Sequence, residues 1–249
     1  MSFSLLIDTL NRAADDGKRF DFWLRDDDAI QPTELLEKLL TLTAQAGVPL
    51  TLASIPADAT IALADRIAVA AHVSVAVHGW NHKNYAPLGA KKQELGLHRG
   101  QDKVMQKIEA GLERISALFG PRSVAMLVPP WNRIDAALAP FLGPAGFRGL
   151  SVFGPEKRDT SIALLNTHVD VIDWKGNRGG RDADVLAAEV TRRIGQLTDN
   201  PLDTIGILTH HQDHDAAAWD FLERLFAHTT GHPACRWMRS EDILSAAGA

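Results

Sequence analysis

The stretch FDFWLRDDDA (residues 20–29) joins a short apolar run directly to three consecutive aspartates. Six further apolar runs of similar length follow along the chain, and each also ends in polar or turn-forming residues. They are VPLTLASI (48–55), VSVAV (73–77), SVAMLV (123–128), FRGLSVF (147–153), HVDVI (168–172) and TIGILT (204–209). Short, nearly continuous apolar runs are typical of strands buried on both faces, as in parallel sheets covered by helices. The seven runs therefore predict the strands of a parallel sheet.

Segments with helical periodicity alternate with these predicted strands. The pattern is clearest between Thr33 and Gly47, where leucines recur along one side of the predicted helix. Further helical segments lie at 57–71, 101–119, 183–198 and 215–227, with a weaker one at 135–142. Strands that alternate with helices predict βα units and an α/β fold. In a chain of 249 residues without an obvious linker, about seven such units favour a single domain over residues 1–249, built as a closed or nearly closed barrel.

The composition is that of a globular protein and argues against several classes of function. Hydrophobic residues make up 45% and charged residues 23% of the chain, which excludes a disordered chain, a collagen-like repeat and a coiled coil. The net charge of −5 and the lack of a basic tract argue against binding to nucleic acids or anionic membranes. Cys235 is the only cysteine, so no intrachain disulfide can form.

The N-terminal stretch lacks the basic start and unbroken apolar core of an export signal. No apolar run approaches the roughly 18 residues that a membrane helix requires. We therefore expect a cytoplasmic protein that does not bind membranes.

Chemically capable side chains follow the apolar runs, where the chain leaves each predicted strand. They are Asp26, Asp27 and Asp28, His78 and His82, residues 129–132 (PPWN), Asp173 and Trp174, and His210 and His211. In parallel α/β folds the loops that leave the strand C-termini open on one face of the molecule. We therefore expect these residues, distant in sequence, to meet in one site.

The segment HGWNH (78–82) places two imidazoles four residues apart, which lets both reach one metal ion if the segment turns helically. The aspartates of RDDDA (25–29) offer a further ligand, because adjacent carboxylates repel one another and a half-buried cluster needs a cation. Neighbouring residues of an extended chain point to opposite sides, so one aspartate can bind metal while the next faces a substrate. The alternatives are hydrogen-bonded loop histidines and a solvated acidic cluster that favours the dipole of the following helix.

His210 ends the last apolar run. A histidine at a strand end that faces a metal can donate a proton to a leaving group near neutral pH. A hydrogen-bonded core histidine is the alternative, and for His210 taken alone it is the better interpretation. Trp131 and Trp174 also follow strand ends, where they either wall a sugar or small-molecule ring or pack at the barrel rim.

In order and spacing these segments resemble the polysaccharide deacetylase family, which is carbohydrate esterase family four and is also called the NodB homology domain. The resemblance covers nearly the whole chain, from Arg25 to about His211, and rests on five motifs. Its first two motifs, an aspartate pair after an apolar strand and a histidine pair four apart, are matched by Asp27 with Asp28 and His78 with His82. The other three are matched by VPPWN (128–132), by the Asp-x-x-Asp-Trp pattern of Asp170, Asp173 and Trp174, and by ILTH ending in His210.

The resemblance implies a NodB-like distorted (β/α) barrel of about seven parallel strands that binds one divalent metal, usually zinc. It also implies hydrolysis of an N- or O-acetyl group of a carbohydrate. By the same resemblance Asp28, His78 and His82 hold the metal, Asp27 is the general base and His210 is the general acid. A role in binding substrate or supporting the site is implied for Pro130, Trp131, Asn132, Asp170, Asp173 and Trp174.

The chain departs from the family pattern at three positions. Val128 stands where the third motif normally has an arginine that orients the catalytic aspartate. Asn132 replaces the usual glycine, and His211 stands where an aspartate often follows the last histidine. Arg25 or Arg133 is a candidate for the missing guanidinium. Because Asp26 precedes Asp27 and Asp28, the aspartate pair of the first motif can also be aligned one position earlier, with Asp26 and Asp27.

Three functions follow from these patterns. The first is a metal-dependent hydrolase that removes acetyl groups from an acetylated carbohydrate. The second is a related amidohydrolase that acts on a small amide, which the lack of an export signal favours. The third, motivated by Val128, is a catalytically degenerate module that binds metal or carbohydrate without turnover. A glycosidase with paired carboxylates would leave the histidine pair unexplained.

Overall fold

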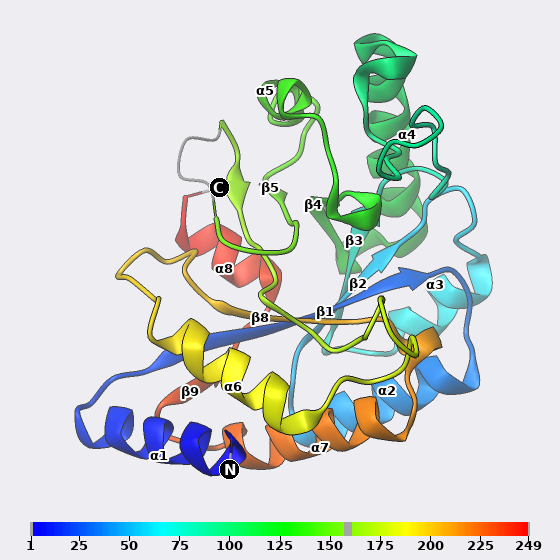
Figure 1. Cartoon of the computed structure of the whole chain (residues 1–249). Coiled ribbons are helices and arrows are strands. Elements are labelled where there is room, and N and C mark those ends of the chain that lie inside the picture. Colours follow the sequence, from blue (N-terminus) through cyan, green and yellow to red (C-terminus); the bar gives the residue numbers. More distant parts are fainter. Residues whose placement is uncertain (1, 157–160, 249) are drawn as a thin grey trace.

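The computed structural model describes residues 2–156 and 161–248, and strands alternate with helices along them (Figure 1). The strands are β1 (Phe20–Ala29), β2 (Leu50–Ser54), β3 (Val73–His78), β4 (Ser123–Val128), β5 (Gly149–Leu150), β6 (Ala163–Leu164), β7 (Val169–Asp170), β8 (Ile205–Thr209) and β9 (Cys235–Trp237). The helices are α1 (Ser2–Asp15), α2 (Glu34–Ala46), α3 (Ile61–Ala68), α4 (Gln101–Phe119), α5 (Ala139–Leu142), α6 (Ala183–Ile194), α7 (Ala216–Thr229) and α8 (Ser240–Ala246).

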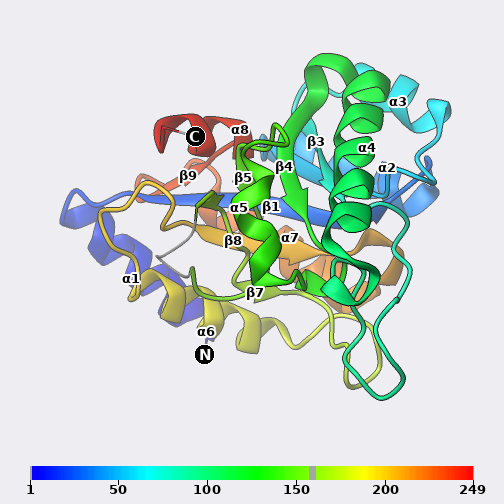
Figure 2. The ribbon, with the colours of Figure 1, turned by 90° about the horizontal axis from the view of Figure 1, so that it is seen from above.

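The strands form one curled sheet in which neighbouring strands are parallel (Figure 2). The strand order is β6-β5-β4-β3-β2-β1-β8-β7, and β9 pairs with the start of β1. Over the described residues β6 and β7 do not pair, and an isolated bridge between Phe153 and Thr167 continues the register of β5 with β6. The sheet is therefore an open, distorted barrel, which confirms the predicted fold class.

Each of the seven predicted runs contains one strand, and the sheet has two more. These are β6 and β9, which are only 2 and 3 residues long. β5 and β7 are also only 2 residues long, but each lies within a longer apolar run that predicted it, whereas β6 and β9 lie outside the seven runs.

Most predicted helices begin at a side-chain cap. Thr33 and Asp215 accept hydrogen bonds from backbone N–H groups at the first turns of α2 and α7. Gly47 ends α2 in the left-handed region with φ 67. The helix expected at 57–71 begins only at Ile61, because Thr60 is its N-cap residue. The weak pattern at 135–142 forms a 3-10 turn followed by the single turn α5.

The two faces of the sheet bury different residues. Phe22 and Leu24 of β1 face outward and join the main core between the sheet and the helices. The helices α1, α6, α7 and α2 lie side by side in that spatial order on this face of the sheet (Figure 1). Inward-facing Trp23 belongs to a second cluster with Met126 of β4 and Leu244 of α8. Helix α8, which no sequence pattern predicted, thereby fills the interior near the N-terminal ends of the strands. Arg25 and Asp27 follow Trp23 on the inner face of β1 and lie nearer the C-terminal ends of the strands.

No helix within the described ranges combines the length and the apolar character that crossing a bilayer requires.

One buried histidine makes stability depend on pH. His214 lies at the start of α7 with its ring edge against Trp219, and burial lowers its pKa to about 4. The unfolded chain therefore takes up this proton first as the pH falls below about 6.5, and stability is lost down to about pH 4. We expect His214 to account for a loss of about 2 kcal/mol between pH 7 and pH 5.

Urea unfolding at the two pH values measures this loss. The His214→Gln variant should lose less stability than the wild type over this interval, whereas exposed His98→Gln should behave like the wild type. An equal pH dependence in wild type and His214→Gln would contradict the prediction.

Candidate active site

The aspartates at the end of β1 point in different directions. Arg25 and Asp27 lie on the inner face of the barrel, and Asp26 lies on the other face, as strand alternation requires. The register with β2 shifts between Asp27 and Ala29, and Asp28 has φ 70, in the left-handed region. Aspartate tolerates this backbone better than most residues do, and a bulge of this kind redirects a side chain. Asp28 thereby faces the end of β3.

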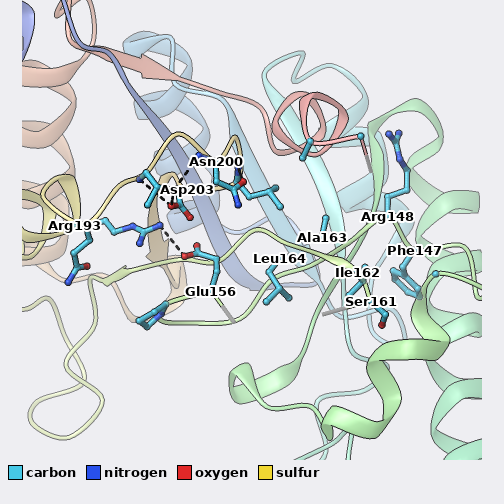
Figure 3. Close-up of a pocket in the computed structure, with 17 residues that line it drawn as sticks. Phe147, Arg148, Glu156, Ser161, Ile162, Ala163, Leu164, Arg193, Asn200 and Asp203 are labelled. Carbon is cyan, nitrogen blue, oxygen red and sulfur yellow. Dashed lines mark hydrogen bonds and ion pairs between the residues drawn. The ribbon is translucent and has the colours of Figure 1, made fainter. Parts of the chain in front are cut away.

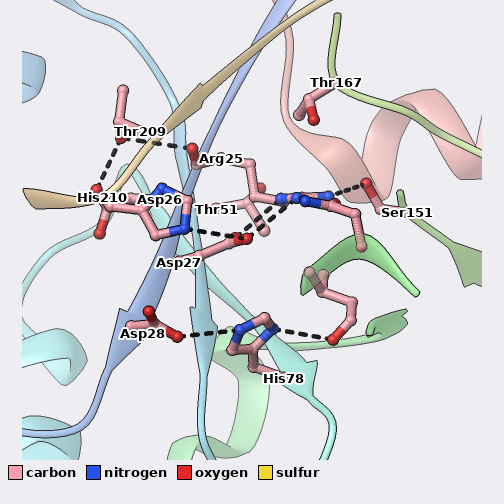
Figure 4. Close-up of polar contacts among 12 residues, drawn as sticks. Arg25, Asp26, Asp27, Asp28, Thr51, His78, Ser151, Thr167, Thr209 and His210 are labelled. Carbon is pink, nitrogen blue, oxygen red and sulfur yellow. Dashed lines mark hydrogen bonds and ion pairs between the residues drawn. The ribbon is translucent and has the colours of Figure 1, made fainter. Parts of the chain in front are cut away.

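Asp28 meets the two histidines of HGWNH, and Figure 4 shows its contact with His78. Its Oδ1 lies 3.1 Å from His78 Nε2 and 3.4 Å from His82 Nε2. One ligand atom from each residue lies within 4.8 Å of the others, as in a group that holds one metal ion. The predicted metal ligands are therefore brought together.

The surroundings of these ligands favour metal binding. His78 Nδ1 donates to the carbonyl oxygen of Val128 at 2.9 Å, which leaves Nε2 free to act as ligand. Burial would raise the pKa of Asp28, but the rings of His78 and His82 lower it overall to well below its usual range. Burial would lower the pKa of His78, but Asp28 and Asp27 raise it overall. This set of one carboxylate and two imidazoles fits a divalent cation.

Glu94 holds the backbone that carries His82. Its Oε1 accepts hydrogen bonds from the backbone N–H of Trp80 at 2.8 Å and of Asn81 at 3.2 Å, and its Oε2 accepts from that of His82 at 2.9 Å. The Glu94 side chain is fully buried, and burial raises its pKa although these N–H groups oppose the shift. The turn includes left-handed backbone at Gly79 and His82. The sequence analysis did not identify Glu94, because a carboxylate bound to backbone amides leaves no residue pattern.

We expect Glu94→Ala to weaken metal binding without removing a ligand. Loss of the three N–H bonds frees the turn that carries His82, and loss of a supporting contact of this kind typically weakens metal affinity about 10- to 100-fold. Titration of the metal-free protein with zinc measures the effect, and exposed Glu113→Ala is the matched control. Equal zinc affinity in the Glu94→Ala and Glu113→Ala variants would show that the turn holds its shape without Glu94.

His210 lies beside Asp27 at the end of β8. Its Nε2 is 3.9 Å from Asp27 Oδ2, and the edge of Trp174 contacts its ring with centroids 4.6 Å apart. Asp170 Oδ2 accepts a hydrogen bond from Trp174 Nε1 at 2.8 Å, and burial raises the pKa of Asp170. The two catalytic candidates thus face one another, and Asp170 supports the tryptophan that contacts His210.

The other predicted supporting residues divide into two groups. Trp131 packs against the ring of His82 with centroids 4.4 Å apart, and buried Pro130 lies close behind Gly79. Asn132 binds Arg25 rather than a metal ligand. Asp173 instead accepts hydrogen bonds from the N–H groups of Lys175 and Gly176 in its own turn, so it shapes the loop behind Trp174.

No family model matches the chain, and no curated protein is significantly similar to it in sequence. Solved structures do match it over nearly its full length. A protein from Mycobacterium smegmatis assigned as a polysaccharide deacetylase has a TM-score of 0.67 and 16% identity, over 94% of this chain and 91% of that chain. The family 4 carbohydrate esterase from Streptomyces lividans, solved with acetate, has a TM-score of 0.59 and 20% identity, over 91% and 95% of the two chains. A family 4 acetyl xylan esterase from Clostridium thermocellum, solved with a cobalt ion, has a TM-score of 0.56 and 15% identity, over 92% of each chain.

The chain has the polysaccharide deacetylase fold. Of the two candidates for the missing guanidinium, Arg25 is the one that contacts Asp27. Its Nε lies 2.9 Å from Asp27 Oδ1 and its Nη2 lies 3.1 Å from Asp27 Oδ2, so the guanidinium binds both oxygens of the carboxylate. Arg25 is fully buried, and it also donates to Ser151 Oγ at 2.7 Å (Figure 4). It donates to Asn132 Oδ1 at 2.7 Å as well. The other candidate, Arg133, is bound to the carbonyl oxygen of Lys92 instead.

A separate cavity of about 830 Å³ shares no residue with this site (Figure 3). Two of its charged lining residues are paired, since Arg193 Nη2 lies 3.1 Å from Glu156 Oε2, and Glu156 Oε1 also lies 2.9 Å from His168 Nε2. The metal ligands and catalytic candidates of the deacetylase fold all lie outside it.

Proposed function

We propose that the chain is a metal-dependent hydrolase that removes N- or O-linked acetyl groups from an acetylated carbohydrate. The observation that carries this proposal is the convergence of Asp28, His78 and His82 beside the facing pair of Asp27 and His210. Ligands alone would support a structural metal, whereas a carboxylate and a histidine beside them supply a base and an acid. The deacetylase fold of the chain adds to the support.

The metal that we propose is zinc, held by Asp28, His78 and His82. When bound, it supplies a positive charge that lowers the pKa of a water molecule to about 7 and stabilises negative charge on the acetyl oxygen. The chain itself must then move two protons.

Asp27 accepts the first proton. The water oxygen adds to the acetyl carbonyl carbon, and its proton passes to the carboxylate of Asp27. Both oxygens of that carboxylate are bound by Arg25, which fixes its direction. Buried Ser151 and Asn132 fix Arg25 in turn.

His210 gives the second proton. As the carbon–nitrogen or carbon–oxygen bond breaks, its electron pair stays on the leaving nitrogen or oxygen, which takes a proton from His210. The products are acetate and a free amine or alcohol on the sugar. Trp131 and Trp174 contact the rings of His82 and His210 and are therefore placed to wall the sugar.

Acetate release from defined substrates tests the proposal. The purified protein is freed of metal with a chelator, reloaded with zinc, and assayed with N-acetylated chito-oligosaccharides, acetylated xylo-oligosaccharides and small acetamides. We expect acetate release from a sugar that disappears with the chelator and returns with zinc, and a fall of about 10²- to 10⁴-fold in His210→Ala.

Two other outcomes would favour the competing functions. Release from small amides alone would favour an amidohydrolase. Saturable binding of the sugars by the zinc-loaded protein, with no release from any substrate, would favour a module without turnover.

A further inference from the structure

The proposed reaction assigns no role to Asp26. It is fully buried on the face of β1 opposite to Asp27, so it does not reach the base, the metal ligands or a substrate. An ionised group in such a place is costly unless it is fully hydrogen-bonded. Its partners therefore indicate what it does.

Within the described ranges, the hydrogen bonds to the Asp26 side chain come from the residues on either side of His210. Asp26 Oδ2 accepts from Thr209 Oγ1 at 2.7 Å and from the backbone N–H of His211 at 2.8 Å. Asp26 Oδ1 lies 2.5 Å from His211 Nδ1. We call Asp26, Thr209 and His211 the Asp26 cluster.

The Asp26 cluster fixes His210 from behind. Asp26 and Thr209 are also register partners in the β1–β8 ladder, so the end of β8 is tied to β1 by side chains as well as backbone. The His211 ring is fully buried, and its Nε2 has no hydrogen-bond partner within the described residues, so the bond to Asp26 is the one that orients it. With both neighbours held, the backbone of His210 has little freedom to rotate.

We propose that Asp26 and His211 are positioning residues that set the direction in which His210 faces Asp27 and the leaving group. The inference rests on the proposed function, because it assigns His210 its role as general acid. The three aspartates of β1 then have different roles. Asp28 binds the metal, Asp27 accepts a proton, and Asp26 orients the general acid His210.

Leaving groups of different basicity separate this role from a purely structural one. An amine or a sugar alkoxide needs a proton from His210, whereas 4-nitrophenolate leaves without one. The readout is therefore the ratio of two kcat/KM values, for the acetylated oligosaccharide that the wild type hydrolyses and for 4-nitrophenyl acetate. We expect this ratio to fall at least about 10-fold in Asp26→Ala, in the same direction as in His210→Ala.

Thr209 supplies a matched pair of milder variants. Thr209→Val keeps the shape of the side chain but loses the donor to Asp26, whereas Thr209→Ser keeps the donor. We expect the ratio to fall several-fold in Thr209→Val and to stay at the wild-type value in Thr209→Ser. The comparison of the two Thr209 variants also tests the inference if the Asp26→Ala variant does not fold.

The double variant Asp26→Ala/His210→Ala completes the test. Because Asp26 acts through His210, we expect its ratio to equal that of His210→Ala alone. An unchanged ratio in Asp26→Ala and Thr209→Val, or a further fall in the double variant, would overturn the inference. A wild-type protein that hydrolyses no acetylated sugar would instead overturn the proposed function, before any variant is compared.

Discussion

His78→Ala is expected to lose both its bound metal and its acetate release. His78 is buried and held by Val128 at Nδ1 and by Asp28 at Nε2, so no neighbouring side chain can take its place. Loss of the metal removes several kcal/mol of stabilisation from the transition state, which corresponds to a fall in rate of roughly a thousand-fold or more. Elemental analysis of the purified variant beside the wild type, with acetate release from the same samples, measures both effects.

Asp27→Asn is the matched contrast to His78→Ala. It removes the base but none of the three ligands, so metal content should stay near the wild-type value while the rate falls about 10²- to 10⁴-fold. If Asp27→Asn loses the metal and His78→Ala keeps it, the ligands and the base have been assigned to the wrong residues.

The second large effect is expected in Arg25→Leu. This substitution leaves the buried carboxylate of Asp27 without its partner, which typically costs about 3–5 kcal/mol of unfolding free energy. The folded fraction should also release acetate at least about 100-fold more slowly, because the base is no longer held in place. Urea unfolding gives the first quantity, and the rate per folded molecule gives the second.

Arg193→Leu is the control for Arg25→Leu. Arg193 is also a buried arginine paired with a carboxylate, that of Glu156, but it lines the separate cavity. We expect a comparable loss of stability with little change in the rate per folded molecule. Equal losses of rate in the two variants would mean that Arg25 acts only through general stability.

The strands and helices could be predicted because burial imposes a period on the sequence. The inner and outer faces of β1 are both buried, so its apolar run is nearly unbroken. The ends of α2 can be predicted because Thr33 and Gly47 are typical residues for the two ends of a helix. The site could be predicted because its residues follow those strands directly. Helix α8 could not, since it is short and meets the barrel through a few residues such as Leu244.

The supporting contacts of the site had no comparable signal. Sequence patterns identified Arg25 as one of two candidates for the missing guanidinium, but only the shared face of β1 decides between Arg25 and Arg133. Glu94 binds backbone amides, which every residue possesses. The extra aspartate raised a question of register, which the structure answers through the bulge after Asp27.

The left-handed backbone at Asp28 narrows the evolutionary choices open to that position. A glutamate would keep the charge but suits the backbone poorly, and most other residues would lose both the ligand and the conformation. Asparagine and glycine tolerate the dihedral angles without offering a carboxylate. We therefore expect homologues that have lost catalytic activity to carry Asn or Gly at this position. The residue at this position should then distinguish inactive homologues from active ones.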